Sequence, residues 1–359
     1  MSYKYQRIVI KIGSNVLTQA NGLPDVERIT NLVAQIAAIQ SSGTEVILVS
    51  SGAVASGRSL IKLPEKTDQI AARQLLASVG QVKLINTYAQ LFETYEILCS
   101  QVLVTREDFR DRTHYLNMKN CLEILLQHKV LPIVNENDVV SVTELMFTDN
   151  DELAGLLASM LNAQALIILT NVDGIFTGDP KLPSSSLIEE IGQSGIDFSS
   201  FVSTGKSQFG RGGMITKSTM AQKVAHLGIA VHIANGTTDS ILTDVLSGAV
   251  KHTRFIPDRS ASGKKKWIAH SANYAVGEVK INEGASLALN SARANSLLPV
   301  GITQISHEFK KGDIIKVVDE HGKLIGQGIA EYGSDKARER MGKKNEKALI
   351  HYDYLYLQS

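Results

Sequence analysis

Two lysines beside glycines are the residues with the clearest chemical meaning. Lys217 follows the stretch Gly210-Arg211-Gly212-Gly213 in a helix-like run, and Lys11 precedes Gly13 in an apolar, strand-like run. Glycines let backbone N–H groups approach an anion, and a helix N-terminus adds partial positive charge. The pattern favours a phosphate site other than a Walker loop, because Lys217 does not directly follow the last glycine. The alternatives are an ordinary loop before a helix and a Lys11 side chain that reaches the surface.

Three clusters of small or polar residues could supply the rest of a site. Ser50-Ser51-Gly52 and Asn135-Glu136-Asn137-Asp138 each follow a strand-like run, and Thr148-Asp149-Asn150-Asp151 precedes a helix-like run. Ligands of open α/β folds bind at the carboxyl ends of the strands. Carboxylates there could bind a metal ion or an ammonium group. A packing turn, a solvated turn and a helix cap are the alternatives.

Strand-like and helix-like segments alternate through the first part of the chain. Strands are predicted over residues 7–12, 45–49, 97–104, 130–134, 165–169 and 229–234. Helices are predicted after a cap at Asp25 and over residues 67–95, 112–128, 152–161, 214–227 and 238–246. This alternation predicts an α/β fold with a doubly wound, mostly parallel sheet. It also brings the candidate residues to strand ends and helix starts, along one edge of that sheet.

The pattern changes near residue 258. A stretch with Pro, Ser, Gly and three consecutive lysines over residues 251–266 is typical of a boundary. Short predicted strands follow at 278–281, 302–309, 313–318, 324–331 and 348–352. We therefore assign residues 1–258 to an α/β domain, 259–275 to a linker and 276–359 to a small β-rich domain.

Charge is unevenly distributed between these parts. Residues 259–359 hold 16 Lys+Arg against 11 Asp+Glu, while the residues before them hold 21 against 25. A basic tail admits an anionic partner such as RNA, and Tyr352 and Tyr354 could stack on bases. The alternative is a solvated surface with aromatic side chains that pack in a sheet.

Composition is that of a globular protein, with 359 residues, 43% hydrophobic and 20% charged. Cys99 and Cys121 lie in apolar surroundings without metal-ligand spacing, which argues against a disulfide framework or a zinc site and predicts buried thiols. No apolar run reaches the roughly 18 residues of a membrane span. We expect a cytoplasmic protein without a membrane partner.

Five motifs carry a family resemblance. They are Ile10-Lys11-Ile12-Gly13-Ser14, Val49 to Val54, Val134 to Asp138, Thr148 to Asp151, and Gly210 to Lys217. Their order and spacing resemble the glutamate 5-kinases of the amino-acid kinase family, and the β-rich tail resembles a PUA domain. The resemblance covers nearly the whole chain and implies the amino-acid kinase fold.

The resemblance also implies an activity. It is transfer of the γ-phosphoryl group of ATP, with Mg²⁺, to the side-chain carboxylate of L-glutamate, the first step of proline biosynthesis. Inhibition by proline and a homo-oligomer are implied as well. Matching positions make Lys11, Lys217 and Asp149 catalytic, with Asp149 orienting the lysines. No protein ligand to a metal is assigned.

Ligand contacts are implied by the same matching. ATP would contact Lys11, Gly13, Thr170, Asn171, Arg211, Gly212, Gly213, Met214, Ile215, Thr216 and Lys217. Glutamate would contact Ser51, Gly52, Asn135, Asp138 and Asn150, with Asp138 facing its ammonium group. Asn171 departs from the acidic residue common in the family, so its nucleotide contact is an open question.

Two other functions compete with this one. A different amino-acid kinase, acting on aspartate, acetylglutamate or carbamate, would keep both lysines but change the elements around Ser51 and Asn135 to Asp138. An RNA-binding protein would use the β-rich tail with Lys264-Lys265-Lys266 and Trp267.

Overall fold

The protein is described by a computed structural model, in two compact units, Met1–Ser260 and Ala261–Ser359. The described residues are 3–64, 67–141, 147, 149–180, 182–192, 213–258, 268, 275–289, 291 and 295–357. Each unit has its own hydrophobic core.

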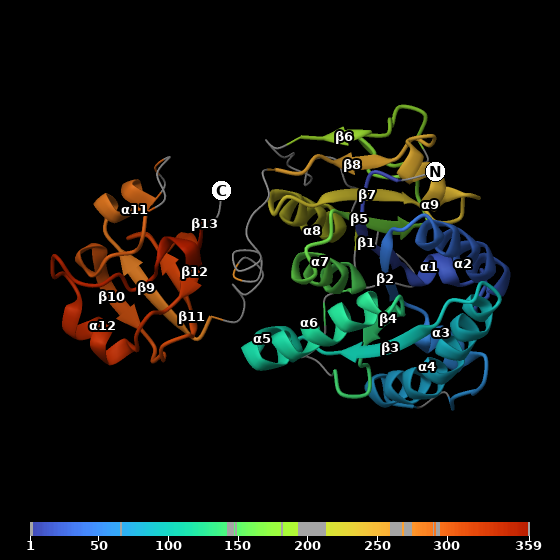
Figure 1. Cartoon of the computed structure of the whole chain (residues 1–359), viewed down its shortest axis with the longest axis horizontal. Coiled ribbons are helices and arrows are strands. Elements are labelled where there is room, and N and C mark those ends of the chain that lie inside the picture. Colours follow the sequence, from blue (N-terminus) through green and yellow to red (C-terminus); the bar gives the residue numbers. More distant parts are fainter. Residues whose placement is uncertain are drawn as a thin grey trace. The chain divides into compact units, whose positions relative to one another are not determined.

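An eight-stranded sheet forms the centre of the first unit (Figure 1). Its strand order is β3-β4-β2-β1-β5-β7-β8-β6. Every recorded pairing is parallel except that of β7 with β8. The strands are β1 (Arg7–Ile12), β2 (Glu45–Ser50), β3 (Cys99–Val104), β4 (Leu131–Glu136), β5 (Ala165–Thr170), β6 (Glu190–Ile191), β7 (Ala230–Asn235) and β8 (Thr253–Phe255). The prediction of a mostly parallel α/β fold is confirmed.

Helices cover both faces of this sheet (Figure 1). They are α1 (Ser14–Leu17), α2 (Val26–Ser41), α3 (Ala53–Arg58), α4 (Gln69–Glu93), α5 (Glu107–Arg110), α6 (Arg112–Gln127), α7 (Asn150–Met160), α8 (Met214–His226) and α9 (Ile241–Ser247). None of the helices in the described part of the chain is long and apolar enough to span a membrane.

Alternation along β1 decides which face receives the lysine. Ile8, Ile10 and Ile12 belong to the core cluster that α2, α4 and α9 complete. Side chains of a strand point alternately to opposite faces. Lys11 therefore points to the other face, where α7 packs on β1 and β5.

Several element boundaries differ from the sequence prediction. β4 runs on to Glu136, so half of the polar cluster at 135–138 belongs to the strand itself. α7 begins at Asn150 because Asp149 caps it. β6 and β8 were not predicted, since two or three residues are too short for a periodic signal. Most of the predicted linker over residues 259–275 lies outside the described residues.

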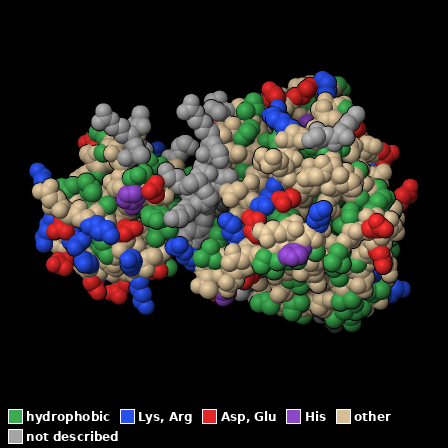
Figure 2. All heavy atoms as spheres, in the orientation of Figure 1, with side chains coloured by type: hydrophobic (Ala, Val, Ile, Leu, Met, Phe, Trp, Pro, Cys, Tyr) green, Lys and Arg blue, Asp and Glu red, His purple; other side chains and the backbone are tan. Residues whose placement is uncertain are grey.

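The second unit is a five-stranded sheet in the order β10-β9-β11-β12-β13. Its strands are β9 (Gly277–Ile281), β10 (Ile302–Ser306), β11 (Ile314–Val318), β12 (Leu324–Ile329) and β13 (Leu355–Leu357), and its helices are α11 (Glu283–Leu289) and α12 (Ser334–Arg340). The β-rich prediction is confirmed, although neither helix was predicted. Figure 2 shows acidic and basic side chains interspersed over the visible face of this unit.

The prediction of a last strand over residues 348–352 is wrong. Ile350 forms an isolated bridge with Leu297, and a 3-10 helix follows over Tyr352–Tyr354. The His351 ring accepts a hydrogen bond from the Asp353 N–H and caps this helix, so the strand begins only at Leu355. Tyr352 and Tyr354 therefore do not alternate along a strand.

The cysteines are less buried than predicted. Cys121 is exposed on α6, and Cys99 is half-buried. Cys99 lies on β3, the outermost strand of its sheet. Apolar neighbours in the sequence did not reveal this position at the edge.

Candidate active site

The carboxyl ends of the parallel strands open into a pocket of about 1370 Å³. The predicted site residues that line it are Lys11, Gly13, Ser51, Gly52, Asn135, Asp138, Asp149, Asn150, Thr170, Asn171, Gly213, Met214 and Lys217. Ile215 and Thr216 are described but are not among the lining residues, because Met214 and Lys217, three residues apart, share one face of α8 and the two residues between them lie on other faces. Arg211 and Gly212 lie outside the described residues.

Both lysines converge on one carboxylate. Lys11 Nζ lies 2.6 Å from Asp151 Oδ1, and Lys217 Nζ lies 2.7 Å from Asp151 Oδ2. Asp151 is fully buried. Burial alone would raise the pKa of Asp151, but the two lysines outweigh it and hold the pKa below its ordinary value. Asp151 in turn raises the pKa of Lys217 against the effect of burial. Lys217 is therefore charged at neutral pH.

The expected lysine partner Asp149 has a different contact. Its Oδ1 accepts hydrogen bonds from the N–H groups of Asp151 and Glu152 at 3.0 and 3.1 Å, so it is the N-cap of α7. Among the described residues, the recorded ion pairs of both lysines are with Asp151. The role of Asp149 in orienting the lysines stays a prediction, and Lys217 and Lys11 also act on Asp149 through charge, since both lower its pKa against the effect of burial. Burial and the nearby Asp151 carboxylate raise the pKa of Asp149.

A sequence signal for Asp151 was available. α7 is buried along almost its whole length, from Asp151 and Leu153 to Met160. A carboxylate in a helix that is buried on every side requires a partner of opposite charge. Reading the acidic cluster as a cap accounted for Asp149 and left Asp151 unexplained.

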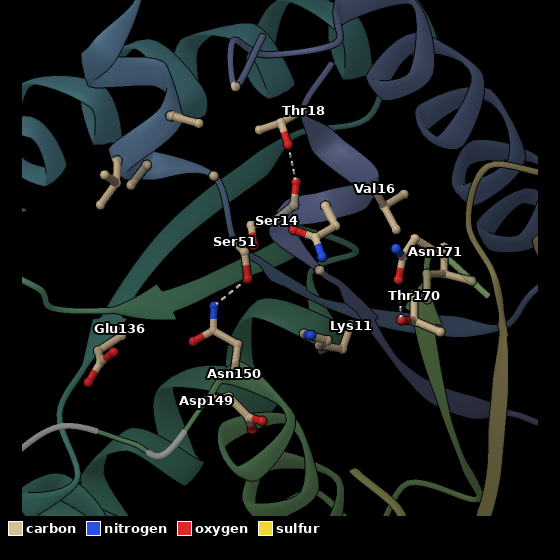
Figure 3. A pocket seen from close by; sticks show the side chains of 18 of the residues that line it. Lys11, Ser14, Val16, Thr18, Ser51, Glu136, Asp149, Asn150, Thr170 and Asn171 are labelled. Carbon is tan, nitrogen blue, oxygen red and sulfur yellow. Dashed lines mark hydrogen bonds between the residues drawn. The ribbon is translucent and has the colours of Figure 1, made fainter. Parts of the chain in front are cut away.

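Amide side chains link three of the predicted substrate residues. Asn150 Nδ2 donates to Ser51 Oγ at 2.9 Å and to Asn135 Oδ1 at 3.0 Å, and Asn135 Nδ2 donates to Gln81 Oε1 at 3.0 Å. These hydrogen bonds thus connect the ends of β2 and β4 to the middle of α4 and the start of α7. Figure 3 shows the Ser51–Asn150 bond at the pocket wall.

Asp138 lies beside a cation that the sequence analysis did not single out. Arg73, on α4, donates from Nε to Asp138 Oδ1 at 2.9 Å and makes a second, shorter contact to the same oxygen through Nη2. Arg73 Nη2 also lies 3.4 Å from Glu136 Oε2. Burial, with a contribution from Asp138, raises the pKa of Glu136 to about 7, although Arg73 opposes the shift.

Two glycines allow the backbone to approach Lys11 and to turn after Ser51. A Cβ on Gly13 would lie 3.2 Å from the Leu169 carbonyl oxygen and 3.3 Å from Lys11 Nζ. Gly52 has a φ of 106° in the left-handed region and begins α3. Residues with a Cβ atom are strained in this region, which explains why a glycine follows Ser51.

The pocket has two ends in the view of Figure 3. Ser51, Asn150 and Glu136 lie to one side of Lys11, and Thr170 and Asn171 lie to the other. Thr170 Oγ1 is 3.4 Å from Asn171 Oδ1. A site with lysines between two unlike walls can hold two ligands and neutralise negative charge where they meet.

Comparison with known proteins agrees with this arrangement. Residues 6–235 match the amino acid kinase family, and residues 277–352 match the PUA domain. The chain is 54% identical over 361 residues to a glutamate 5-kinase of Bacteroides thetaiotaomicron, covering 100% of both chains. It is 51% identical to a glutamate 5-kinase of Chlorobaculum tepidum, covering 98% of both.

Among solved structures, a carbamate kinase from Giardia lamblia bound to AMP-PNP has a TM-score of 0.52 and 20% identity. The match covers 71% of this chain and 99% of that one, and it supports the fold. The fold, the matched domains and the full-length relatives agree: the chain belongs to the amino acid kinase family, among the glutamate 5-kinases that carry a C-terminal PUA domain.

Proposed function

We propose that this protein transfers the γ-phosphoryl group of ATP to the side-chain carboxylate of L-glutamate and so opens proline biosynthesis. The observation that carries the proposal is the convergence of Lys11 and Lys217 on buried Asp151 at the pocket. Two cations share one carboxylate, so the trio keeps one net positive charge. The full-length relatives named glutamate 5-kinase support the choice of substrate.

The chemistry needs little more than position and charge. A carboxylate is already a nucleophile, so no general base is required. Two anions must be held in line while negative charge spreads over the transferring group. Buried lysines fixed by Asp151 are suited to this task, because preorganised charge is most effective where water is excluded.

The nucleotide end is assigned to the wall beyond Lys11. We assign ATP contacts to the two lysines and to the residues predicted with them: Gly13, Thr170, Asn171, Arg211, Gly212, Gly213, Met214, Ile215 and Thr216. Asn171 is neutral, so any contact it makes would be a hydrogen bond and not a charge pair.

Mg²⁺ would enter with ATP. Among the described residues no group of three His, Cys, Asp or Glu side chains is placed to hold a metal ion. Asp149 Oδ2 is nevertheless buried and has no recorded hydrogen-bond partner in the described part of the chain. A metal shared between phosphate oxygens and Asp149 fits these donors, and it would offset charge between the phosphates.

The glutamate end is assigned to Ser51, Gly52, Asn135, Asp138 and Asn150. Its side-chain carboxylate would lie near Asn150 and Lys11, and its ammonium group would face Asp138. In addition we propose proline as an inhibitor at or beside this wall, and a homo-oligomer. RNA binding by the C-terminal unit is less favoured, because both signs of charge are mixed on the face seen in Figure 2.

The experiment is a hydroxamate assay of the purified full chain with ATP and Mg²⁺. We expect product with L-glutamate and little with aspartate or acetylglutamate. Added proline should reduce the rate. Product with another acid but not with glutamate would refute the substrate assignment.

A further inference from the structure

We infer that Arg73 binds the α-carboxylate of the substrate, so that Arg73 and Asp138 together recognise the zwitterionic head of an α-amino acid. This inference rests on the proposed function. Arg73 lines the same pocket as Asp138.

The Arg73–Asp138 ion pair leaves one group open on each partner. Both recorded contacts of Arg73 to Asp138 fall on Oδ1, and within the described residues Oδ2 has no recorded hydrogen bond. Arg73 uses Nε and Nη2, while Nη1 has no recorded partner among the same residues. The pair therefore offers one free acceptor and one free donor side by side. An ammonium group and a carboxylate on one carbon atom are the complement of that arrangement.

Partial burial of this ion pair strengthens the hydrogen bonds that a ligand can make to it. The Asp138 side chain is 9% exposed and that of Arg73 is 29% exposed. Charged groups at the wall of a pocket are partly desolvated before a ligand arrives, so charge-assisted hydrogen bonds to them are stronger than on a free surface.

α4 holds Arg73 in register with the loop that carries Asp138. Gln74 Nε2 donates to the Val139 carbonyl oxygen at 2.8 Å, and Gln81 Oε1 accepts from Asn135 at 3.0 Å. The two residues contacted, Asn135 and Val139, lie before and after Asp138 in the sequence. Arg73 is thus presented from a fixed helix, as a binding residue should be.

The position fits the direction of the reaction. Glu136, which Arg73 contacts at 3.4 Å, lies on the far side of Asn150 from Lys11 in Figure 3. A head group held there leaves the other end of the substrate directed toward Asn150 and Lys11. The carboxylate that remains near the lysines is then the distal one.

The test measures binding, so that it does not depend on turnover. Dissociation constants for L-glutamate, glutarate and 4-aminobutyrate are measured by calorimetry on the full chain and on Arg73→Gln. Glutarate lacks only the ammonium group of glutamate, and 4-aminobutyrate lacks only the α-carboxylate. Turnover of glutamate by the unaltered chain is measured separately and reports on the proposed function alone.

Arg73→Gln should weaken glutamate and glutarate by about 10- to 100-fold, the range for a charge-assisted hydrogen bond. It should leave 4-aminobutyrate within about threefold, because that ligand lacks the α-carboxylate that Arg73 would bind and keeps only the distal carboxylate. Asp138→Asn should show the reverse pattern, weakening 4-aminobutyrate and sparing glutarate. Arg73→Lys should recover part of the loss, since it keeps the charge without the planar fork.

Arg28→Gln is the matched control, since Arg28 forms an exposed pair with Asp239 at 3.4 Å. It should change none of the three constants. Equal weakening of glutarate and 4-aminobutyrate by Arg73→Gln would show that Arg73 only positions Asp138 and would overturn the inference. Tighter glutamate binding in Arg73→Gln would also overturn it, because Arg73 would then compete with the substrate ammonium group.

Discussion

At the scale of single residues, the main feature of the pocket is a buried carboxylate, Asp151, that pairs with two lysines. Lys11, Lys217 and Asp151 form a trio whose net charge is positive, and Asp149 adds a carboxylate with a raised pKa beside it. A polyanionic ligand in the pocket would therefore meet positive charge that Asp151 holds in place. The strength of this effect depends on Asp151, because two buried lysines without it would repel each other.

Asp151→Asn should lower kcat by about 100-fold or more, the scale for losing one preorganised charge contact. The amide keeps the shape but not the charge that fixes both lysines. KM for glutamate should change by less than about threefold, because the head group is bound elsewhere. Steady-state kinetics on protein shown to be folded by circular dichroism is the measurement.

Asp239→Asn is the control for this prediction, since it removes an exposed carboxylate that pairs with Arg28. It should leave kcat unchanged. A kcat within about threefold of the unaltered chain in Asp151→Asn would contradict the role of the trio.

Glu136 should make stability depend on pH. Its folded-state pKa of about 7 lies above the ordinary value of 4.5, so between these values the folded protein holds a proton that the unfolded chain has released. The contribution of Glu136 to the free energy of unfolding should therefore fall as pH rises from 4.5 to 7 and level off above. Glu136→Gln should remove this contribution and, relative to the unaltered chain, gain about 1–2 kcal/mol at pH 8, a few degrees in melting temperature.

Melting of both proteins between pH 5 and pH 8 is the measurement, with Glu189→Gln as an exposed control. Parallel curves for the unaltered chain and Glu136→Gln would contradict the raised pKa.

At the scale of elements, α4 organises the substrate wall. It carries Arg73 and Gln81 to the end of β4, and it packs closely on α3, which begins at the turn after Ser51. The close approach is possible because Gly57 and Gly80 meet there without side chains. A Cβ on Gly80 would lie 1.8 Å from the Ala53 carbonyl oxygen and 2.3 Å from Gly57 N.

Gly80→Ala should destabilise the protein by about 3 kcal/mol and raise KM for glutamate. The new Cβ would meet backbone atoms that have no free rotamer to adopt, so α3 and α4 must separate and shift the wall beside Gly52. Denaturant unfolding and kinetics measure the two effects. Gly192→Ala is the matched control, because a Cβ there has nothing within 4 Å. Equal stability of the two variants would refute the close packing of the helices.

At the scale of the whole chain, the pocket lies in the first unit, and the C-terminal unit has a separate hydrophobic core. Every pocket-lining residue lies in the first unit, at or before Lys217. The chain stays attached to that unit as far as Asp258, whose N–H donates to Ala225 and whose carboxylate pairs with His226 at 2.8 Å. The second unit has its own buried cluster, including Val279, Ile315 and Leu349.

A chain ending after Asp258 should fold and keep glutamate-dependent ATP turnover within about fivefold of the full chain, because it retains the pocket and its core. Turnover at saturating substrates and a cooperative melt are the measurements. The response to proline and the oligomer size are compared in the same samples. A folded truncation without turnover would show that the second unit completes the active site.

The sequence by itself determined the class of fold and the chemistry of the pocket. Apolar runs of strand length alternating with periodic helices require a parallel sheet, and residues at strand ends must then share one edge. Lys11, Ser51, Asn135 and Asn150 could be placed there because that inference needs only local pattern and connectivity. The prediction of a strand over residues 348–352 was wrong, because a 3-10 helix capped by His351 precedes β13 there.

Tertiary structure alone decided which charges meet. Arg73 and Asp138 are 65 residues apart, and Lys11 and Asp151 come from different elements. Local periodicity does not encode such pairings. They form only in the folded protein, where β1 and α7 bring Lys11 to Asp151 and the packing of α4 brings Arg73 to Asp138. The same cause brought Asp151 into ion pairs with both lysines and left Asp149 as the cap of α7, since the two carboxylates differ in the direction in which each side chain points.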